Sequence, residues 1–258
     1  MSANDPSKHE ALRRGNADYQ WSDLDAEAYF NHYYGEPHPD DDTVVECAVE
    51  ALKEAAPLGR ELDIVDVGTG ANLIPLFCAL PRATSLTVWE YARSGIAWLR
   101  AELTSDVMRP QWQHFWTLTC RAYGREYLLA ENPMPALRAK TKIEQGSIFD
   151  LPERRWDAAT MFFCAESITQ LQDEFEAACA AFARCVKPGG TLAAAFLAHS
   201  AGYIVKGSPF PALPLSVESV VCAFIPHADK VHAKSIGIVE QQIRSGYSGL
   251  VFLTATAR

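Results

Sequence analysis

A short apolar run that ends in a glycine-rich turn constrains the fold of this chain more than any other feature. Residues 62–67 read LDIVDV, the turn is Gly68-Thr69-Gly70, and residues 71–80 read as a buried helix. Glycines at such a turn let the backbone bend sharply and approach a ligand closely. This order of strand, turn and helix predicts the opening unit of a nucleotide-binding α/β fold.

Glu90 supports this prediction from the next strand. Residues 85–90 predict that strand, and its last residue lies about 20 residues after the turn, where nucleotide-binding folds place the carboxylate that holds ribose hydroxyls. A dinucleotide site needs a third glycine so that a pyrophosphate can sit at the helix N-terminus, but this chain has Ala71-Asn72-Leu73 there. A ligand without phosphates fits better, which favours S-adenosylmethionine over NAD.

The rest of the chain alternates between predicted strands and helices, which predicts a doubly wound, mostly parallel sheet of the Rossmann-like α/β class. Further strands are expected at residues 142–145, 158–163, 191–197, 235–241 and 250–254, the last two as a hairpin around Ser245-Gly246. Further helices are expected at residues 26–34, 42–55, 95–103 and 173–186. The segment 105–141 is rich in aromatic residues and has little strand character, so we expect inserted helices and loops there.

Composition restricts the partners and the compartment. The formal net charge is −9 and no basic run is interleaved with aromatics, so nucleic-acid binding is not expected. Residues 1–15 lack the apolar segment of a signal peptide, and no run approaches the roughly 18 apolar residues needed to cross a bilayer. The seven cysteines form no C-x-x-C pair and do not cluster with histidines, so no metal site is expected. We expect a cytoplasmic protein without a membrane partner.

Several motifs outside the glycine turn resemble those of one enzyme family. They are the Tyr-x-x-x-Tyr-Tyr spacing of Tyr29, Tyr33 and Tyr34, the segment 112–124, and the elements Cys164-Ala165-Glu166, Gly202-Tyr203 and Leu213-Pro214-Leu215. With them, the chain resembles the class I methyltransferases of the nicotinamide, phenylethanolamine and indolethylamine N-methyltransferase family from about Tyr29 to Leu253. The resemblance implies one domain over residues 1–258 with a seven-stranded sheet, an N-terminal helical lid at about 18–58 and a helical insertion at about 105–141.

The resemblance also implies a set of contacts to S-adenosylmethionine. They are expected from Tyr29, Tyr34, Gly68, Thr69, Gly70, Asn72, Glu90, Tyr91, Gly95, Ser147, Ile148 and Phe162. Two of these positions depart from the family pattern. Ser147 replaces an acid, which leaves Asp150 as a possible substitute, and Gly95 replaces an asparagine, so two hydrogen bonds are expected to be lost.

On the acceptor side, Glu166 matches the carboxylate that receives an amine in the phenylethanolamine enzyme, and Tyr203 matches a pocket tyrosine. A second pocket acid of the family falls at Phe196 or Ser200. The expected acceptor pocket comprises Tyr33, Phe163, Glu166, Phe196, Ser200 and Tyr203, and the expected catalytic residues are Glu166, Tyr29 and Tyr203. Methyl donation depends mostly on positioning and desolvation, and Glu166 would orient the amine or relay its proton.

Three functions follow from these residues. The first is methyl transfer to nitrogen of a small amine or heteroaromatic molecule, by a monomer or weak homodimer. The second is cyclisation of S-adenosylmethionine itself to azetidine-2-carboxylate and methylthioadenosine, for which the aromatic faces of Tyr29, Phe162, Phe163 and Phe196 would attract the sulfonium. The third is a cofactor-binding regulatory protein without turnover.

Overall fold

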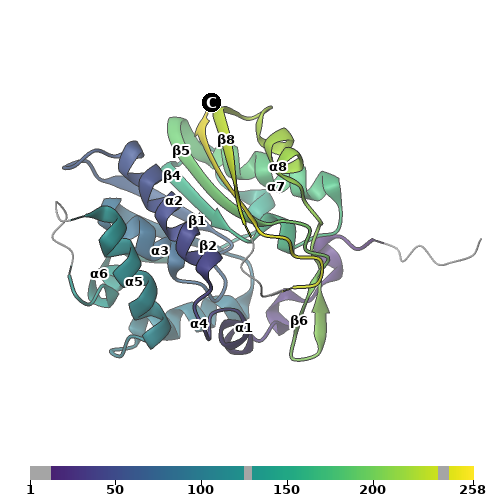
Figure 1. The fold of residues 1–258 in the computed structure, drawn as a ribbon, viewed down its shortest axis with the longest axis horizontal. Helices are drawn as coiled ribbons and strands as arrows, with labels where there is room; N and C mark the ends of the chain where they lie inside the picture. Colours follow the sequence, from purple (N-terminus) through teal and green to yellow (C-terminus); the bar gives the residue numbers. More distant parts are fainter. Residues whose placement is uncertain (1–12, 125–129, 238–243) are drawn as a thin grey trace, which may run out of the picture.

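A seven-stranded sheet forms the centre of the protein, with the strand order β3-β2-β1-β4-β5-β9-β8 (Figure 1). The computed structural model describes residues 13–124, 130–237 and 244–258. The strands are β1 (Leu62–Val67), β2 (Ala83–Glu90), β3 (Thr141–Gln145), β4 (Trp156–Phe162), β5 (Val186–Leu197), β8 (Ala228–Ile236) and β9 (Leu250–Ala257). The five neighbouring strands β3, β2, β1, β4 and β5 pair in parallel, whereas β9 runs antiparallel between β5 and β8. The predicted Rossmann-like, mostly parallel sheet with a C-terminal hairpin is confirmed.

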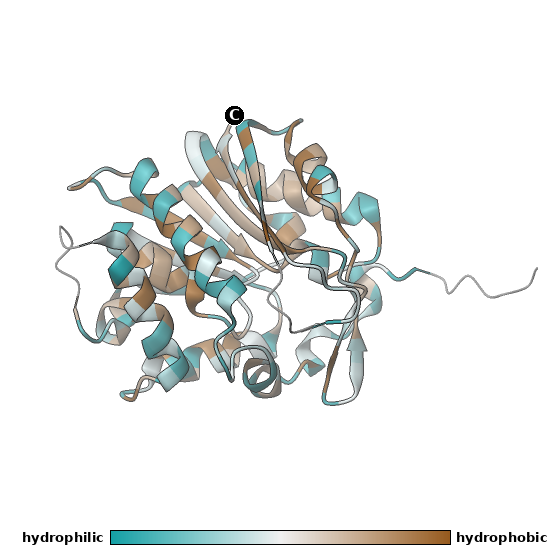
Figure 2. Ribbon diagram, viewed as in Figure 1, coloured by the Kyte–Doolittle hydropathy of each residue, from teal (hydrophilic) through white to brown (hydrophobic). Residues whose placement is uncertain are grey.

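Helices cover both faces of this sheet. They are α1 (Ala26–Tyr33), α2 (Pro39–Ala55), α3 (Ile74–Ala79), α4 (Arg93–Thr104), α5 (Pro110–Tyr123), α6 (Met134–Lys140), α7 (Gln172–Cys185) and α8 (Val217–Phe224). One buried apolar cluster joins the sheet to α2, α3, α5 and α6, and a second joins it to α7 and α8. In Figure 2 the outer sides of α2, α5 and α6 are teal, while the central strands are mostly brown to white. The amphipathic pattern of the helices therefore determines which side meets the sheet.

Alternation along β5 decides which of its side chains can approach a ligand. Ala195 and Leu197 belong to the cluster on the α2 side, whereas Ala194 and Phe196 belong to the cluster on the α7 side. Successive side chains of a strand point to opposite faces, so the two sets cannot share one pocket.

The predicted helical insertion contains α5 and α6. Its aromatic residues Trp112, Phe115 and Trp116 are almost completely buried. Trp112 and Trp116 pack against Phe77 of α3, and Phe115 packs against Trp112. These side chains are part of the core. A small hairpin of β6 (Tyr203–Val205) and β7 (Ser208–Phe210), and helix α8, have no counterpart among the predicted elements.

The strand expected at residues 235–241 needs correction. It begins at Ala228 and ends at Ile236, while residues 238–241 lie outside the described part of the chain. Strand β8 is an edge of the sheet, and most of its side chains are at least partly exposed. Exposed edge strands carry charged side chains, so the polar sequence of β8 does not predict a strand over its full length.

Two other predicted boundaries also move. The strand expected at residues 158–163 ends at Phe162, because Phe163 adopts a φ of 58°. Strand β5 begins at Val186 instead of Thr191, and its pairing with β4 is irregular next to Trp156. Residues 187–190, between the predicted helix and the predicted strand, therefore belong to the strand as an irregular stretch.

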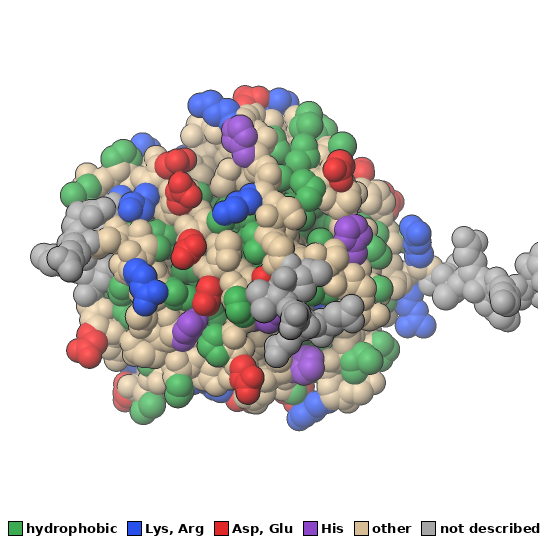
Figure 3. All heavy atoms as spheres, in the orientation of Figure 1, with side chains coloured by type: hydrophobic (Ala, Val, Ile, Leu, Met, Phe, Trp, Pro, Cys, Tyr) green, Lys and Arg blue, Asp and Glu red, His purple; other side chains and the backbone are tan. Residues whose placement is uncertain are grey.

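No helix in the described ranges has both the length and the apolar character needed to cross a bilayer. On the face shown in Figure 3, acidic and basic side chains of the described residues are scattered among one another.

Candidate cofactor and acceptor site

A cavity with an empty volume of about 970 Å³ lies at the carboxyl ends of four parallel strands. Its floor consists of residues 67–72 after β1, 89–92 at the end of β2, 146–148 after β3 and 162–164 after β4. Ligands of open α/β sheets bind at this edge of the sheet. Segments from the N-terminal region and the β6–β7 hairpin cover the cavity, and α1 and β6 lie together at the bottom of Figure 1.

The glycine turn after β1 is held from below by a buried carboxylate. Asp66 accepts hydrogen bonds from the hydroxyls of Thr69 (2.5 Å) and Thr160 (2.6 Å), and burial raises its pKa to about 7. Gly68 and Gly70 have φ values of 68° and 55°, a region that favours glycine. A Cβ at Gly68 would lie 2.1 Å from Sγ of Cys164. The turn therefore presents bare backbone to the cavity and has no room for a side chain at Gly68.

Asn72 connects this turn to α3. Its side-chain oxygen accepts a hydrogen bond of 2.9 Å from the backbone N–H of Ile74, the first residue of the helix. The side chain is buried and lines the cavity. Asn72 therefore starts the helix and faces the ligand space at the same time.

Glu90 is the buried acid of the cavity floor. One carboxylate oxygen accepts a hydrogen bond from the backbone N–H of Gly70, and the other accepts one from Ala92, both at 2.8 Å. Burial raises its pKa, and the backbone donors oppose that shift. Gly95 lies against this carboxylate, since a Cβ at Gly95 would be 3.4 Å from its Cδ. Tyr91 follows, half exposed at the rim.

The loop after β3 forms the next wall. Trp89 donates a hydrogen bond of 2.9 Å from its indole N–H to the carbonyl of Ser147. Gly146 packs against the same indole, and Ile148 lines the cavity beside Ser147. Asp150 is exposed and does not line the cavity, so the expected substitute for the missing family acid is not supported.

Four tyrosines and one arginine form the cover. Tyr29 packs against Tyr33 and Tyr34 of the same segment, with ring centroids 4.6 and 6.3 Å away, and edge-on against Tyr203 at 6.0 Å. Arg244 donates a hydrogen bond of 3.1 Å to the Tyr29 hydroxyl. Burial raises the pKa of Tyr29 to about 12, so its hydroxyl keeps its proton.

A second, smaller cavity with an empty volume of about 340 Å³ adjoins the first. The two cavities share Tyr29, Tyr34 and Phe163 as lining residues. The smaller cavity is also lined by Tyr33, His38, Asp41, Leu197 and Arg244. Phe163 stands between the cavities with its φ of 58°, and its N–H donates a 2.7 Å hydrogen bond to the carbonyl of Ala195. Backbone in this sparsely populated region is typical of functional sites.

Glu166 is sealed off from both cavities. Its side chain is completely buried, and one carboxylate oxygen accepts hydrogen bonds from the N–H of Leu197 (3.1 Å) and the hydroxyl of Ser167 (3.4 Å). The other oxygen has no partner among the described residues, and burial raises the pKa of Glu166 to about 7. The expectation that Glu166 touches an acceptor therefore does not hold for this arrangement.

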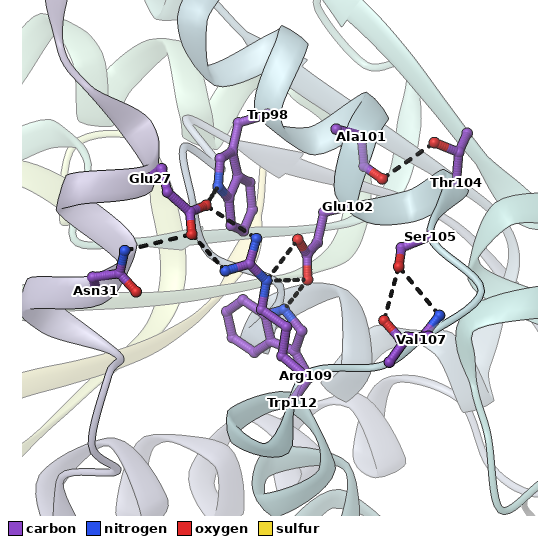
Figure 4. Close-up of polar contacts among 10 residues, drawn as sticks. All are labelled: Glu27, Asn31, Trp98, Ala101, Glu102, Thr104, Ser105, Val107, Arg109 and Trp112. Carbon is purple, nitrogen blue, oxygen red and sulfur yellow. Dashed lines mark hydrogen bonds and ion pairs between the residues drawn. The ribbon is translucent and has the colours of Figure 1, made fainter.

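An ion-pair network fixes α1 over the main cavity (Figure 4). The Arg109 guanidinium bonds both carboxylate oxygens of Glu27 at 2.7 and 3.0 Å and, through Nε, both oxygens of Glu102 at 3.0 and 2.9 Å. Trp98 donates to Glu27 and Trp112 donates to Glu102, each at 2.7 Å. The lid helix is thereby tied to α4 and to the start of α5.

Comparison with protein families identifies the chain. The family model described as the NNMT/PNMT/TEMT family matches residues 14–258. The chain belongs to this family. The members of this family are S-adenosylmethionine-dependent methyltransferases, so S-adenosylmethionine is the cofactor. No curated protein sequence matches the chain.

Solved structures of other methyltransferases share the fold. The DhpI–SAH complex has a TM-score of 0.54 at 13% identity, over 93% of this chain and 98% of that chain. The glycopeptide N-methyltransferase MtfA with SAH has a TM-score of 0.53 at 12% identity, over 83% and 90%. The 1,6-didemethyltoxoflavin-N1-methyltransferase of Burkholderia thailandensis has a TM-score of 0.51 at 14% identity, over 90% and 86%.

The residues of this family member fit the cofactor. Gly68 and Gly70 leave backbone exposed where a side chain would fill the space, and Glu90 presents a buried acid nearby. The cavity brings together all the residues expected to contact S-adenosylmethionine: Tyr29, Tyr34, Gly68, Thr69, Gly70, Asn72, Glu90, Tyr91, Gly95, Ser147, Ile148 and Phe162. Their individual roles stay predictions. No group of three His, Cys, Asp or Glu side chains in the described ranges is placed to hold a metal.

The acceptor residues are brought together less completely. Tyr33, Phe163 and Tyr203 line one or both cavities. Phe196 does not, because it points to the opposite face of the sheet and packs against Phe175 and Phe224. This corrects its expected place in the acceptor pocket.

Ser200 also lies away from the cavities. It is completely buried, and its hydroxyl has no partner among the described residues. Several lining residues were not expected from the sequence, among them Trp21 and Arg244. Trp21 precedes the region of family resemblance, and Arg244 adjoins a predicted hairpin turn, so neither stands in a recognisable motif.

Proposed function

We propose that this protein transfers a methyl group from S-adenosylmethionine to a nitrogen atom of a small molecule. The observation that carries the proposal is the pair of adjoining cavities that share Tyr29, Tyr34 and Phe163. The larger cavity has the glycine turn and Glu90 of a cofactor site, and the smaller one marks the side from which an acceptor would approach. Membership of the NNMT/PNMT/TEMT family and the likeness to N-methyltransferases favour nitrogen as the methylated atom.

The chain contributes positioning and exclusion of water to this reaction. When bound, S-adenosylmethionine supplies an activated methyl group, so no covalent nucleophile is required of the protein. Glu90 would hold the ribose hydroxyls, and the backbone at Gly68 and Gly70 would lie along the methionine part. The buried rings of Tyr34 and Tyr203 would keep water from the reacting atoms. Alignment and desolvation of this kind supply most of the acceleration expected for methyl transfer.

Glu166 acts through its neighbours in this proposal. It holds the N–H of Leu197 and the hydroxyl of Ser167, and Ser167 lines the main cavity. We therefore assign Glu166 a positioning role and leave proton removal from the acceptor to solvent or to a group of the acceptor itself.

Product analysis tests the proposal. The purified protein is incubated with S-adenosylmethionine, alone and with a panel of amines and azaheterocycles, and the adenosyl products are followed by mass spectrometry. Acceptor-dependent S-adenosylhomocysteine, lost in Glu90→Ala but kept in the exposed control Glu50→Ala, is the expected result. Methylthioadenosine formed from the cofactor alone in a Glu90-dependent manner would instead establish cyclisation. Tight cofactor binding without any product would indicate a regulatory protein.

A further inference from the structure

Arg244 places a buried positive charge on the acceptor side of the site. Its side chain is almost completely buried, with Nη1 donating a hydrogen bond of 2.9 Å to the Ser167 hydroxyl and Nη2 donating one of 3.1 Å to the Tyr29 hydroxyl. A guanidinium cannot lose its proton in a protein, so this charge is permanent. The side chain lines the smaller cavity.

The guanidinium occupies the aromatic cage that the tyrosines form. It lies 4.2 Å from the ring centre of Tyr203 and 4.9 Å from that of Tyr33. Aromatic faces arranged in this way attract a cation. Because Arg244 already fills the space between these rings, they are not available to a cationic group of a ligand.

Among the residues that the structure describes, no acid forms an ion pair with Arg244. Its Nε is buried without a hydrogen-bond partner in the same part of the chain. Glu166 acts on it without direct contact, by its charge and through the Ser167 hydroxyl. A buried, unpaired ion is costly, and the cost falls when an anion binds. A negative group bound beside Arg244 would therefore stabilise the described arrangement.

The charged groups of the acceptor side therefore differ from the sequence expectation. The acid expected to face an amine, Glu166, is sealed away, while a cation that the sequence did not reveal faces the cavity. The acid that does line the smaller cavity is Asp41, whose pKa is raised to about 7 by burial and by its neighbours Asp40 and Asp42. His38 and Tyr33 complete the polar lining of this cavity.

We propose that Arg244 binds a carboxylate of the ligand, and that the methyl acceptor is a nitrogen compound bearing that carboxylate. The inference rests on the proposed methyl transfer and specifies its substrate class: an amino acid or a heteroaromatic acid. Arg244 lies with Tyr33 and Leu197 in the smaller cavity, whereas the glycine turn and Glu90 line the larger one. The acceptor is thus the expected source of the carboxylate. The methionine carboxylate of the cofactor is the other possible source.

Matched ligand pairs test the proposal without relying on turnover. Binding of nicotinate and nicotinamide, and of anthranilate and aniline, is measured by calorimetry on the wild-type protein saturated with S-adenosylhomocysteine. If Arg244 makes a charge-assisted contact, the affinity for the better-bound carboxylate should exceed the affinity for its uncharged partner by about 10- to 100-fold. Arg244→Gln is expected to abolish this preference, Arg244→Lys to keep part of it, and the exposed control Arg100→Gln to leave it unchanged. The wild-type comparison remains decisive if a variant does not fold.

A second arm separates the two sources of the carboxylate. Binding of S-adenosylmethionine and of decarboxylated S-adenosylmethionine is measured on the wild type and on Arg244→Gln. If the acceptor provides the carboxylate, the substitution changes both affinities less than about threefold. A loss of ten-fold or more for S-adenosylmethionine alone assigns the carboxylate to the cofactor and overturns the acceptor class.

Two outcomes distinguish this inference from the proposed function. S-adenosylhomocysteine formed equally well with uncharged amines in the wild type and in Arg244→Gln would overturn the role of Arg244 and leave methyl transfer standing. Arg244-dependent carboxylate binding without S-adenosylhomocysteine from any acceptor would support the carboxylate site and overturn methyl transfer.

Discussion

The carboxylate of Glu90 and the backbone N–H of Gly70 are joined by a hydrogen bond of 2.8 Å, which connects the end of β2 to the turn after β1. The second carboxylate oxygen accepts an equally short bond from Ala92. Both oxygens are thus oriented by backbone groups before any ligand arrives. Such preorganisation would let the acid bind ribose hydroxyls, as we propose, with little rearrangement.

Removal of this acid should weaken cofactor binding more than it weakens the fold. Hydrogen bonds to a charged group contribute about 1.5–3 kcal/mol, so Glu90→Ala is expected to raise the Kd for S-adenosylmethionine by roughly 10- to 100-fold. Calorimetric titration measures the change, with the exposed Glu50→Ala as the matched control. An unchanged Kd would show that Glu90 does not contact the cofactor.

Substitution at Gly68 tests the steric fit of the turn. In Gly68→Ala the new methyl group would meet Cys164 at 2.1 Å in a backbone conformation that disfavours alanine. We expect a loss of cofactor binding of at least about tenfold and a lower melting temperature. Gly59→Ala is the matched control, because Gly59 also has a positive φ (88°) but nothing within 4 Å of its added Cβ. Equal effects of the two substitutions would show that backbone strain, and not the contact with Cys164, causes the loss.

The Arg109 network predicts a link between lid position and cofactor affinity. Arg109→Ala leaves the buried Glu102 without its cation and frees Glu27 of α1. A loss of stability on the order of 1–3 kcal/mol is expected, with a melting temperature lower by about 5 °C and weaker cofactor binding below the transition. Arg100→Ala, on the exposed side of α4, should change neither quantity. A lower melting temperature with an unchanged Kd would show that the network stabilises the fold but does not affect cofactor binding.

The raised pKa of Glu166 predicts a pH-dependent stability difference. The buried carboxyl has a pKa of about 7, above its ordinary value of 4.5, so the folded state holds this proton more tightly than the unfolded state. Its contribution to stability is complete below pH 4.5 and is lost as the pH rises to about 7. Glu166→Gln has no such proton to lose. The free energy of unfolding of the variant, relative to that of the wild type, should therefore rise by on the order of 2–3 kcal/mol between pH 4.5 and pH 8. Urea unfolding at both pH values measures it, and a constant difference would contradict the raised pKa.

The cofactor half of the cavity could be predicted from the sequence because its residues follow strands directly. Gly68 and Glu90 come from the ends of β1 and β2, and parallel neighbours bring strand ends to one edge. The lid tyrosines became visible only through the family motif, since their spacing alone also suits a packing face. Tyr29 illustrates both properties, because it contacts other tyrosines and lines both cavities.

The acceptor half could not be predicted because it depends on tertiary placement. Phe196 occupies a family position, but its neighbour Leu197 is the residue that reaches the smaller cavity. Glu166 lies in a family motif, but the N–H of Leu197 and the Ser167 hydroxyl draw its carboxylate into the interior. Arg244 stands just before a Ser-Gly pair that reads as an ordinary turn. Only its hydrogen bonds to Ser167 and Tyr29 in the folded chain reveal it.

The placement of β9 between β5 and β8 has a consequence for biosynthesis. The chain emerges from the ribosome N-terminus first, so the glycine turn, Glu90 and the lid helix are all available before β9 is made. Arg244 arrives just ahead of that strand, together with Tyr247, whose hydroxyl donates a 2.6 Å hydrogen bond to Asp40 at the start of α2. Strand β9 therefore enters an interior position of the sheet after β5 and β8 have been made, so Arg244 and Tyr247 take their places only as the sheet itself is completed.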